Sequence, residues 1–236
     1  MSNNKQVDTI INKLLNEQEE RETKQPSDKQ VQEIIQDQST SKNLLKTNPS
    51  TQKSLVPPLN FSLVEDGIYR SGFPMPINYQ FLQKLKLKTI IYLGDLSIKK
   101  SKDKNKNGSV DILNNYLKWI DTTNIQFHNL LIESSQEPFN KLEENDQALK
   151  SLTIALQLIL NKKHYPILIH SNKGKHRTGL LVGLMRKLLQ GWCLSGIFEE
   201  YEKFAMGKSE YDLELIELWQ PELWIDDNDK PEFVRT

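Results

Sequence analysis

Hydrophobic residues are spread unevenly along the 236-residue chain. Residues 1–56 are rich in polar side chains and contain no aromatic residue, so they bury too little apolar surface to offset the entropy of ordering. We therefore expect a disordered polar tail here. Within this tail, apolar residues recur at helical spacing and predict an amphipathic helix over residues 5–22: Val7, Ile10, Ile11, Leu14 and Leu15. Two interpretations of this helix stay open, a fluctuating helix in a disordered tail and a docking helix for a partner subunit.

From residue 57 to residue 220 the pattern predicts strands that alternate with helices. Five strands are expected. Two of them lie around an Asp-Gly turn within 60–70, and the others lie at 88–94, 125–132 and 167–169. Helices are expected in the segments between and after them: from residue 78, 109–120, 142–160, 180–189, 195–205 and 210–218. This order predicts an α/β domain with a central, mostly parallel sheet and helices on both faces. Residues 221–236 are expected to form an acidic C-terminal tail.

The strand at 167–169 runs into a short, polar and basic loop that opens directly into a helix. Such a strand–loop–helix points backbone N–H groups and the positive end of the helix at one place, which is typical of an anion site. Lys173, Lys175 and Arg177 add positive charge, so phosphate is the predicted ligand. The loops that begin at Gly94 and Glu133 should line the same pocket, because the carboxyl ends of parallel strands share one edge.

The overall composition narrows the classes of function. Lys plus Arg and Asp plus Glu are balanced at 31 each, so no global field favours nucleic acid or a membrane surface. Cys193 is the only cysteine, which excludes a disulfide scaffold and indicates a reducing compartment; we expect it to be buried. No stretch approaches the roughly 18 apolar residues of a membrane span, and we expect a cytoplasmic protein. No carboxylate cluster accompanies the loop, so neither a metal nor another cofactor is expected.

Two phosphate-loop patterns can be compared with the loop. The nucleotide-binding pattern Gly-x-x-x-x-Gly-Lys-Ser/Thr fails, because Ile169 replaces its first glycine and His176 stands where a hydroxyl must hold magnesium. The second pattern is a nucleophile, five residues and then arginine, and it fits Ser171 to Arg177. Gly174 allows the loop to curl so that its amides surround a phosphate group. The adjacent Thr178 can donate a hydrogen bond to the nucleophile.

This loop matches the signature His-Cys-x5-Arg-Ser/Thr-Gly of the cysteine-dependent phosphatases at every fixed position except the cysteine, where Ser171 stands. Further segments resemble the plant and fungal atypical dual-specificity phosphatases, above all the fungal oxidant-induced cell-cycle-arrest (Oca) and Siw group: Phe61–Val64, Gly67–Pro74, Lys88–Ile91, Glu137–Phe139 and Asn172–Gly179. The resemblance covers about residues 56–220. It implies a dual-specificity-phosphatase-like α/β fold, a cytoplasmic location and a tyrosine or dual-specificity phosphatase. For some members it implies inositol pyrophosphates as substrates.

The loop and the resemblance together assign candidate site residues. The catalytic candidates are Ser171 at the nucleophile position, Arg177 and Thr178, with Glu137 and Asp95 as two candidates for the general acid. The ligand-binding candidates come from the loop itself: His170, Asn172, Lys173, Gly174, Lys175, His176 and Arg177. The ring of His170 is expected to point away from the ligand, and Arg70 is expected to be buried near the pocket.

Ser171 limits the chemistry. Loop amides, a helix N-terminus and cations lower the pKa of a cysteine enough to form a thiolate at neutral pH. The pKa of a serine hydroxyl is much too high for the same effects to ionise it. Serine nucleophiles elsewhere need an adjacent base, and His176 is either such a base or a charged loop residue. The chain should therefore bind phosphate and turn over slowly or not at all.

Three alternatives remain open at this point. The chain is a substrate-trapping variant of a cysteine phosphatase, a natural pseudophosphatase, or an active serine phosphatase. A pseudophosphatase would bind a phosphorylated ligand or hold related phosphatase subunits in a stress-signalling complex. The basic cluster Lys173, Lys175 and His176 favours a densely charged substrate over a flat phosphotyrosine by its charge density. A phosphoprotein and an inositol pyrophosphate both stay open as substrates.

Overall fold

The computed structural model describes residues 54–96, 104–132, 142–207 and 210–235. For residues 104–110 and 142–146 only the backbone is described. The predicted tail at 1–56, apart from its last residues, lies outside this description together with the predicted helix at 5–22. The loop that begins at Glu133, including Glu137, lies outside it as well.

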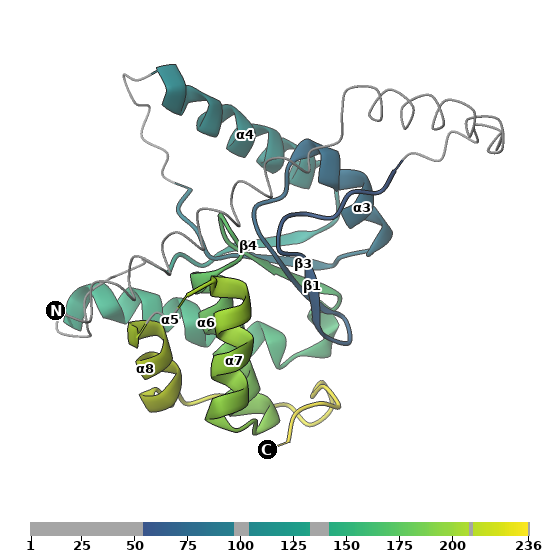
Figure 1. Ribbon diagram of the computed structural model, residues 1–236. Helices are drawn as coiled ribbons and strands as arrows, with labels where there is room; N and C mark the ends of the chain where they lie inside the picture. Colours follow the sequence, from purple (N-terminus) through teal and green to yellow (C-terminus); the bar gives the residue numbers. More distant parts are fainter. Residues whose placement is uncertain (1–53, 97–103, 133–141, 208–209, 236) are drawn as a thin grey trace, which may run out of the picture. The chain divides into compact units, whose positions relative to one another are not determined.

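Five strands form one sheet in the order β1-β2-β5-β3-β4 (Figure 1). Their bounds are β1 Ser62–Glu65, β2 Ile68–Ser71, β3 Thr89–Tyr92, β4 Gln126–Asn129 and β5 Ile167–His170. Only the edge strand β1 runs antiparallel to its neighbour, and the other three pairings are parallel. Every residue of the central strands β3 and β5 is buried, as expected for β-branched, continuously apolar segments covered on both faces. The predicted mostly parallel sheet is confirmed.

Helices cover both faces of the sheet (Figure 1). The helices and short 3-10 turns are η2 Pro76–Asn78, α3 Tyr79–Lys84, α4 Lys104–Asp121, α5 Leu142–Ile159, η3 Lys162–His164, α6 His176–Gln190, α7 Leu194–Ala205 and α8 Glu210–Leu218. On one face, Ile90 and Leu168 pack with side chains of α3 and α4. On the other face, their neighbours Ile91 and Ile169 pack with α5, α6, α7 and α8. This alternation follows from the opposite directions of successive side chains in a strand.

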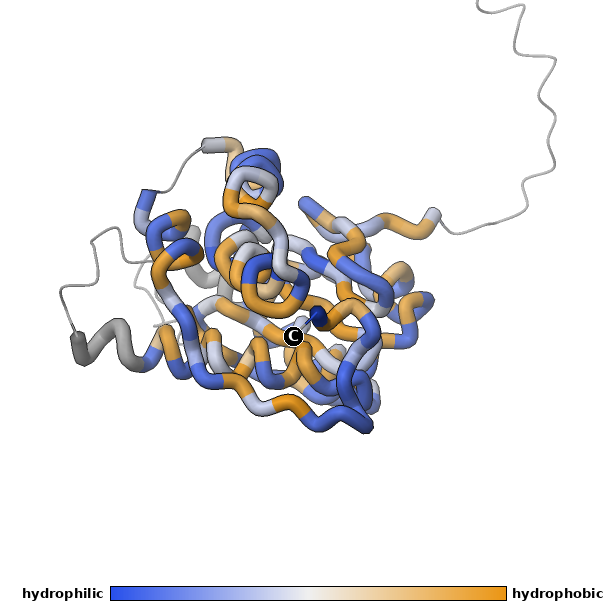
Figure 2. The backbone as a smooth tube through the Cα atoms, turned by 90° about the horizontal axis from the view of Figure 1, so that it is seen from below, coloured by the Kyte–Doolittle hydropathy of each residue, from blue (hydrophilic) through white to orange (hydrophobic). Residues whose placement is uncertain are grey.

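Helix α6 is the central helix of its layer. Eleven of its fifteen residues are buried. Along the described chain, hydrophobic (orange) and hydrophilic (blue) segments alternate (Figure 2). Small residues make this burial possible: a Cβ added at Gly183 would lie 2.6 Å from Cδ1 of Ile216, so α8 packs directly on the α6 backbone. Helix α6 therefore begins at the predicted anion loop and is held on several sides.

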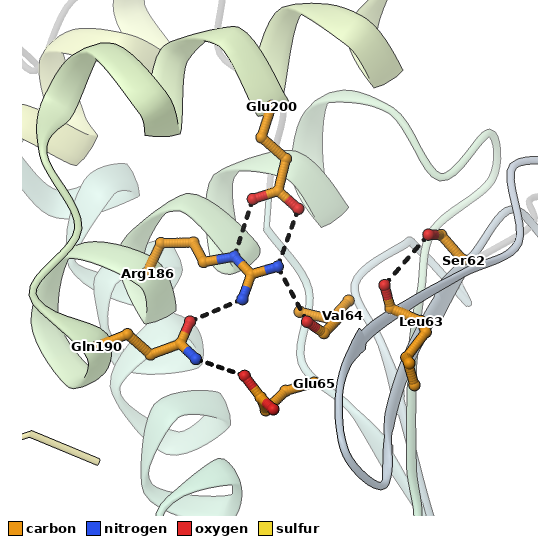
Figure 3. A network of polar contacts seen from close by, with 7 residues as sticks. All are labelled: Ser62, Leu63, Val64, Glu65, Arg186, Gln190 and Glu200. Carbon is orange, nitrogen blue, oxygen red and sulfur yellow. Dashed lines mark hydrogen bonds and ion pairs between the residues drawn. The ribbon is translucent and has the colours of Figure 1, made fainter. Parts of the chain in front are cut away.

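Arg186 of α6 ties this helix to two other elements (Figure 3). Its guanidinium donates to both carboxylate oxygens of Glu200 on α7, at 2.8 and 3.1 Å, and to the Val64 carbonyl of β1 at 2.9 Å. It also donates to Gln190, which in turn donates to Glu65. The buried charge is thus fully paired, and the network fixes the position of α6 relative to the edge strand and to α7.

The sequence prediction for Cys193 is wrong. Its side chain is exposed instead of buried, and its Sγ lies 3.4 Å from Oγ of Ser195. The contact with Ser195 lowers the pKa of the Cys193 thiol. Gly191 ends α6 in the left-handed conformation, with φ of 65°, and the chain then turns outside the core before α7 begins.

Candidate functional site

Four strand ends lie in register at one edge of the sheet. His170, the last residue of β5, pairs with Ser71 of β2 on one side and with Tyr92 of β3 on the other. Tyr92 pairs in turn with Asn129 of β4. Each of these residues ends its strand, so the segments that follow β2, β3, β4 and β5 leave the sheet together. The loop after β5 therefore lies where parallel α/β sheets place their ligands.

Ser171 is the first residue of this loop and is 5% exposed. Its Oγ accepts hydrogen bonds from the Gly174 backbone N–H at 3.1 Å and from the Thr178 hydroxyl at 3.0 Å. Thr178 lies in the first turn of α6 and is fully buried. Two donors thus point at the atom in position 171, which is the arrangement that stabilises negative charge on that atom.

The carbonyl groups of the loop are turned outward by three different donors. The Asn172 carbonyl accepts from the Phe73 N–H, the Lys173 carbonyl from the Asn60 side chain, and the Gly174 carbonyl from Arg70. Because the N–H and the C=O of one peptide unit point in opposite directions, fixing these oxygens directs the following N–H groups toward the inside of the loop. The loop is therefore built as a cradle of amides.

Gly174 sits at the tightest point of the loop. Its φ is 68°, and a Cβ at this position would lie 2.5 Å from the Ser71 carbonyl and from the Gly72 nitrogen. No other residue fits this approach between the loop and the end of β2. The glycine that sequence reasoning selected for curling the loop thus also brings the loop onto the neighbouring strand.

Arg70 is buried under the loop, as the sequence predicted. Its guanidinium donates to the Gly174 carbonyl at 3.1 Å and lies 3.6 Å from the centre of the Phe204 ring. Burial lowers the pKa of Arg70 to about 10, partly opposed by the charge of Glu200, so the side chain stays protonated at neutral pH. Arg70 thus holds the loop through the Gly174 carbonyl, and its side chain stays buried.

His170 is fully buried, and its ring lies among aromatic side chains. Its Nε2 is 2.8 Å from the Tyr116 hydroxyl, and the ring stacks on Tyr92. Burial lowers the pKa of His170 to about 3, so the ring is neutral at physiological pH. The ring therefore shapes the end of β5 and has no access to a ligand or to the Ser171 proton.

Tyr92 connects the end of β3 with the rim of the loop. Its hydroxyl donates to the side-chain oxygen of Asn172 at 2.7 Å. Burial raises the pKa of the Tyr92 phenol, while the nearby charge of Arg177 lowers it and that of Asp95 raises it. Arg177 and Asp95 thus both lie close to the same phenol. The charge of Arg177, the last residue of the nucleophile-x5-Arg pattern, is thus placed beside the Tyr92 phenol.

His176 is linked to α7 and α8. Its Nδ1 lies 2.8 Å from the Tyr201 hydroxyl and 3.6 Å from a carboxylate oxygen of Asp212, and Tyr201 donates to that same oxygen. The neighbouring Lys175 places its Nζ 3.2 Å from Sδ of Met206. Sequence reasoning selected His176 and Lys175 but missed Tyr201 and Asp212, because helical residues far along the chain carry no local signal of this contact.

The predicted site residues from His170 to Thr178 lie on the end of β5, the loop and the first turn of α6, and Asp95 lies near enough to the Tyr92 phenol to raise its pKa. The described ranges contain no group of three or more His, Cys, Asp or Glu side chains placed to hold a metal ion. In the same part of the chain, no helix has the length and apolar character needed to cross a bilayer.

The family model described as "Tyrosine phosphatase family" matches residues 55–236, which include the whole sheet and the loop. The chain belongs to this tyrosine phosphatase family. It is 40% identical over 185 residues to the tyrosine-protein phosphatase-like protein OCA2 of Saccharomyces cerevisiae, covering 76% of this chain and 83% of that protein. It is 42% identical over 154 residues to the inositol diphosphatase DSP4 of Arabidopsis thaliana, covering 65% of this chain and 68% of that protein.

Among solved structures, the chain is similar to the core catalytic domain of the PP-IP phosphatase SIW14 from S. cerevisiae in complex with citrate. The TM-score is 0.54 with 37% sequence identity, covering 71% of this chain and 89% of that domain. These likenesses confirm the resemblance to the plant and fungal atypical dual-specificity phosphatases near the Oca and Siw group. They also confirm the dual-specificity-phosphatase-like α/β fold.

Proposed function

We propose that this member of the tyrosine phosphatase family binds an inositol pyrophosphate through the loop at residues 171–177 and hydrolyses it very slowly or not at all. The relatives named inositol diphosphatase and PP-IP phosphatase support the class of ligand. The amide cradle, Arg177 and the N-terminus of α6 support binding of a phosphate group. We place this activity in the cytoplasm, in line with the absence of a disulfide-forming pair of cysteines.

The observation that carries this proposal is the environment of Ser171 Oγ. The Gly174 amide and the Thr178 hydroxyl both donate to it, which would lower the pKa of a cysteine at this position into the physiological range. The same two donors cannot ionise a serine hydroxyl, and the nearest sequence neighbour, His170, has its ring in the core. The hydroxyl therefore keeps its proton and can donate it as a hydrogen bond to a bound phosphate oxygen.

Binding and hydrolysis use different parts of this site. Binding uses amides and cations, with the planar Arg177 guanidinium available for two oxygens of one phosphate group. Hydrolysis would also require a nucleophile and, for a poor leaving group, an acid such as Asp95 or Glu137. A diphosphate already has a good leaving group, so hydrolysis does not depend on the acid. In our proposal, turnover is limited by nucleophilic attack, because Ser171 provides no thiolate.

A second candidate function is a pseudophosphatase that binds a phosphorylated ligand as one subunit of a phosphatase complex in stress signalling. The same Ser171 supports it, as does the similarity to a relative that is itself named phosphatase-like. In this case the partners are related phosphatase subunits, and a phosphoprotein is the alternative ligand.

Calorimetric titration of the purified chain with inorganic phosphate and with an inositol pyrophosphate tests the proposed site. We expect Arg177→Ala to weaken binding of both probes by at least about tenfold, because it removes a bidentate, charge-assisted contact. Arg235→Ala is the matched control: Arg235 is exposed and its N–H donates to the Leu189 carbonyl near the C-terminal end of α6, about 18 Å along the helix from Arg177. Unchanged binding in Arg177→Ala would refute the site.

A further inference from the structure

The hydrogen bonds of Tyr201 define which nitrogen of His176 carries a proton. The Tyr201 hydroxyl has one hydrogen, and it donates that hydrogen to the carboxylate of Asp212. The same hydroxyl oxygen must then accept from Nδ1 of His176, at 2.8 Å. With the opposite assignment, two oxygen acceptors would face each other at hydrogen-bonding distance. The hydrogen bonds therefore run from His176 through Tyr201 to Asp212, with each residue donating to the next, and Nδ1 is protonated.

Two glycines of α6 place this chain of donors beside the loop. A Cβ added at Gly179 would lie 2.9 Å from the Tyr201 ring, so the ring packs directly on the first turn of α6. Gly183, one turn further along α6, admits Ile216 of α8 in the same way. Helices α7 and α8 thus approach α6 closely at the end where the loop begins, and they bring Tyr201 and Asp212 to His176.

The other edge of the His176 ring is turned away from this contact. Half of the His176 side-chain surface is exposed, and the residue stands immediately before Arg177 at the N-terminal end of α6. With Nδ1 engaged, Nε2 is the remaining polar atom of the ring, and it donates to a phosphate oxygen when it takes up a second proton from solvent or from the ligand.

We propose that Asp212 and Tyr201 are positioning residues that hold His176 with Nδ1 protonated and offer its Nε2 to a second phosphate group of the ligand. This inference rests on the proposed function and adds a second contact to it. The Asp212 carboxylate, 3.6 Å from Nδ1, compensates the positive charge that the ring carries when it donates from both nitrogens. The site then selects molecules with several neighbouring phosphate groups over a single phosphate.

The experiment compares two probes, inorganic phosphate and an inositol pyrophosphate, in the wild-type chain and in Asp212→Asn and Tyr201→Phe. We expect both variants to bind the inositol pyrophosphate about tenfold more weakly, since one charge-assisted contact is lost, and to bind inorganic phosphate as tightly as the wild type. Glu214→Gln removes an exposed charge from the same helix α8 and should change neither affinity. In a His176→Gln background, Asp212→Asn should have no further effect.

Nitrogen-15 NMR of labelled histidine supplies a readout that a purely structural role would not give. We expect His176 to show the tautomer with Nδ1 protonated in the wild type and to lose it in Tyr201→Phe. The opposite tautomer in the wild type, or an equal loss of affinity for both probes in Asp212→Asn, would overturn the inference. If both probes bind and Asp212→Asn changes neither, only the inference fails. If neither probe binds the wild type, the proposed function fails and the inference fails with it.

Discussion

The hydroxyl of Ser171 and the donors around it separate two tasks that the phosphatase loop normally combines. The Gly174 amide and the Thr178 hydroxyl still point at Oγ, and the loop carbonyls are still held outward. What is absent is a cysteine thiol, whose pKa these donors would lower enough to form a thiolate. At the scale of single residues, the donors of a phosphatase loop are in place around a serine hydroxyl, which is why we propose binding without rapid hydrolysis.

Gly174 gives a prediction at this scale. Gly174→Ala should reduce the free energy of unfolding by at least about 2 kcal/mol and abolish phosphate binding, because a left-handed residue with a Cβ is strained and this Cβ meets backbone atoms at 2.5 Å. Urea unfolding and calorimetric titration measure the two effects. Gly191→Ala is the matched control, with φ of 65° and open space around the Cβ, and should cost only about 1 kcal/mol while binding is retained. Normal phosphate binding by Gly174→Ala would contradict the cradle.

At the scale of elements, α6 links the loop to the rest of the domain. Arg186 near its C-terminal end is paired with Glu200 on α7 and with the Val64 carbonyl on β1, while its N-terminal end carries Thr178 and Arg177 (Figure 3). The helix is thus fixed at one end by a buried ionic network and at the other by the loop. Its burial on several sides fixes the first turn of the helix, where the loop ends.

Glu200→Gln gives a prediction at this scale. The variant leaves the Arg186 guanidinium, whose side chain is 7% exposed, without its carboxylate partner. We expect the free energy of unfolding to fall by about 2 kcal/mol, because a charged, largely buried hydrogen-bonded pair is replaced by a weaker neutral one. Glu199→Gln on the exposed side of the same helix should change it by less than about 0.5 kcal/mol. Equal stability of the two variants in urea unfolding would show that the network does not hold α6.

The elements of this fold could be predicted because each carries a local signal. The β-branched runs of β3 and β5 indicate buried strands, and the strand–loop–helix at 167–179 has a fixed spacing that few other sites share. Boundaries were less well predicted: α4 begins at Lys104, ahead of the predicted range of 109–120. Asp103 stands directly before Lys104 and is a preferred N-cap residue type, but residues 104–109 contain no apolar side chain, so the helical periodicity becomes visible only at Val110.

The supports of the site could not be predicted. Tyr116, Asn60 and Asp212 contact the site from distant parts of the chain, and each contact depends on how helices and loops pack in three dimensions. The exposure of Cys193 was missed for the same reason, since burial of a thiol depends on the turn that holds it. The role of a loop residue can be predicted from the local motif, whereas the distant residues that contact it cannot.

At the scale of the whole molecule, the formal net charge is zero, so attraction for a phosphorylated ligand comes from the loop and its neighbours. The family model spans residues 55–236, and the similarity to inositol diphosphatases covers the domain that contains this loop. The domain thus has the fold of its phosphatase relatives, and our proposal is that the serine at position 171 prevents rapid hydrolysis of the ligand.

The most direct test of this account measures release of phosphate from an inositol pyrophosphate by the wild-type chain and by Ser171→Cys. We expect the cysteine variant to release phosphate at least about a thousandfold faster, because the donors at position 171 stabilise a thiolate but not an alkoxide. Ser171→Ala serves as the control and should be as slow as the wild type. Rapid release by the wild-type chain, or no release by Ser171→Cys, would contradict the account.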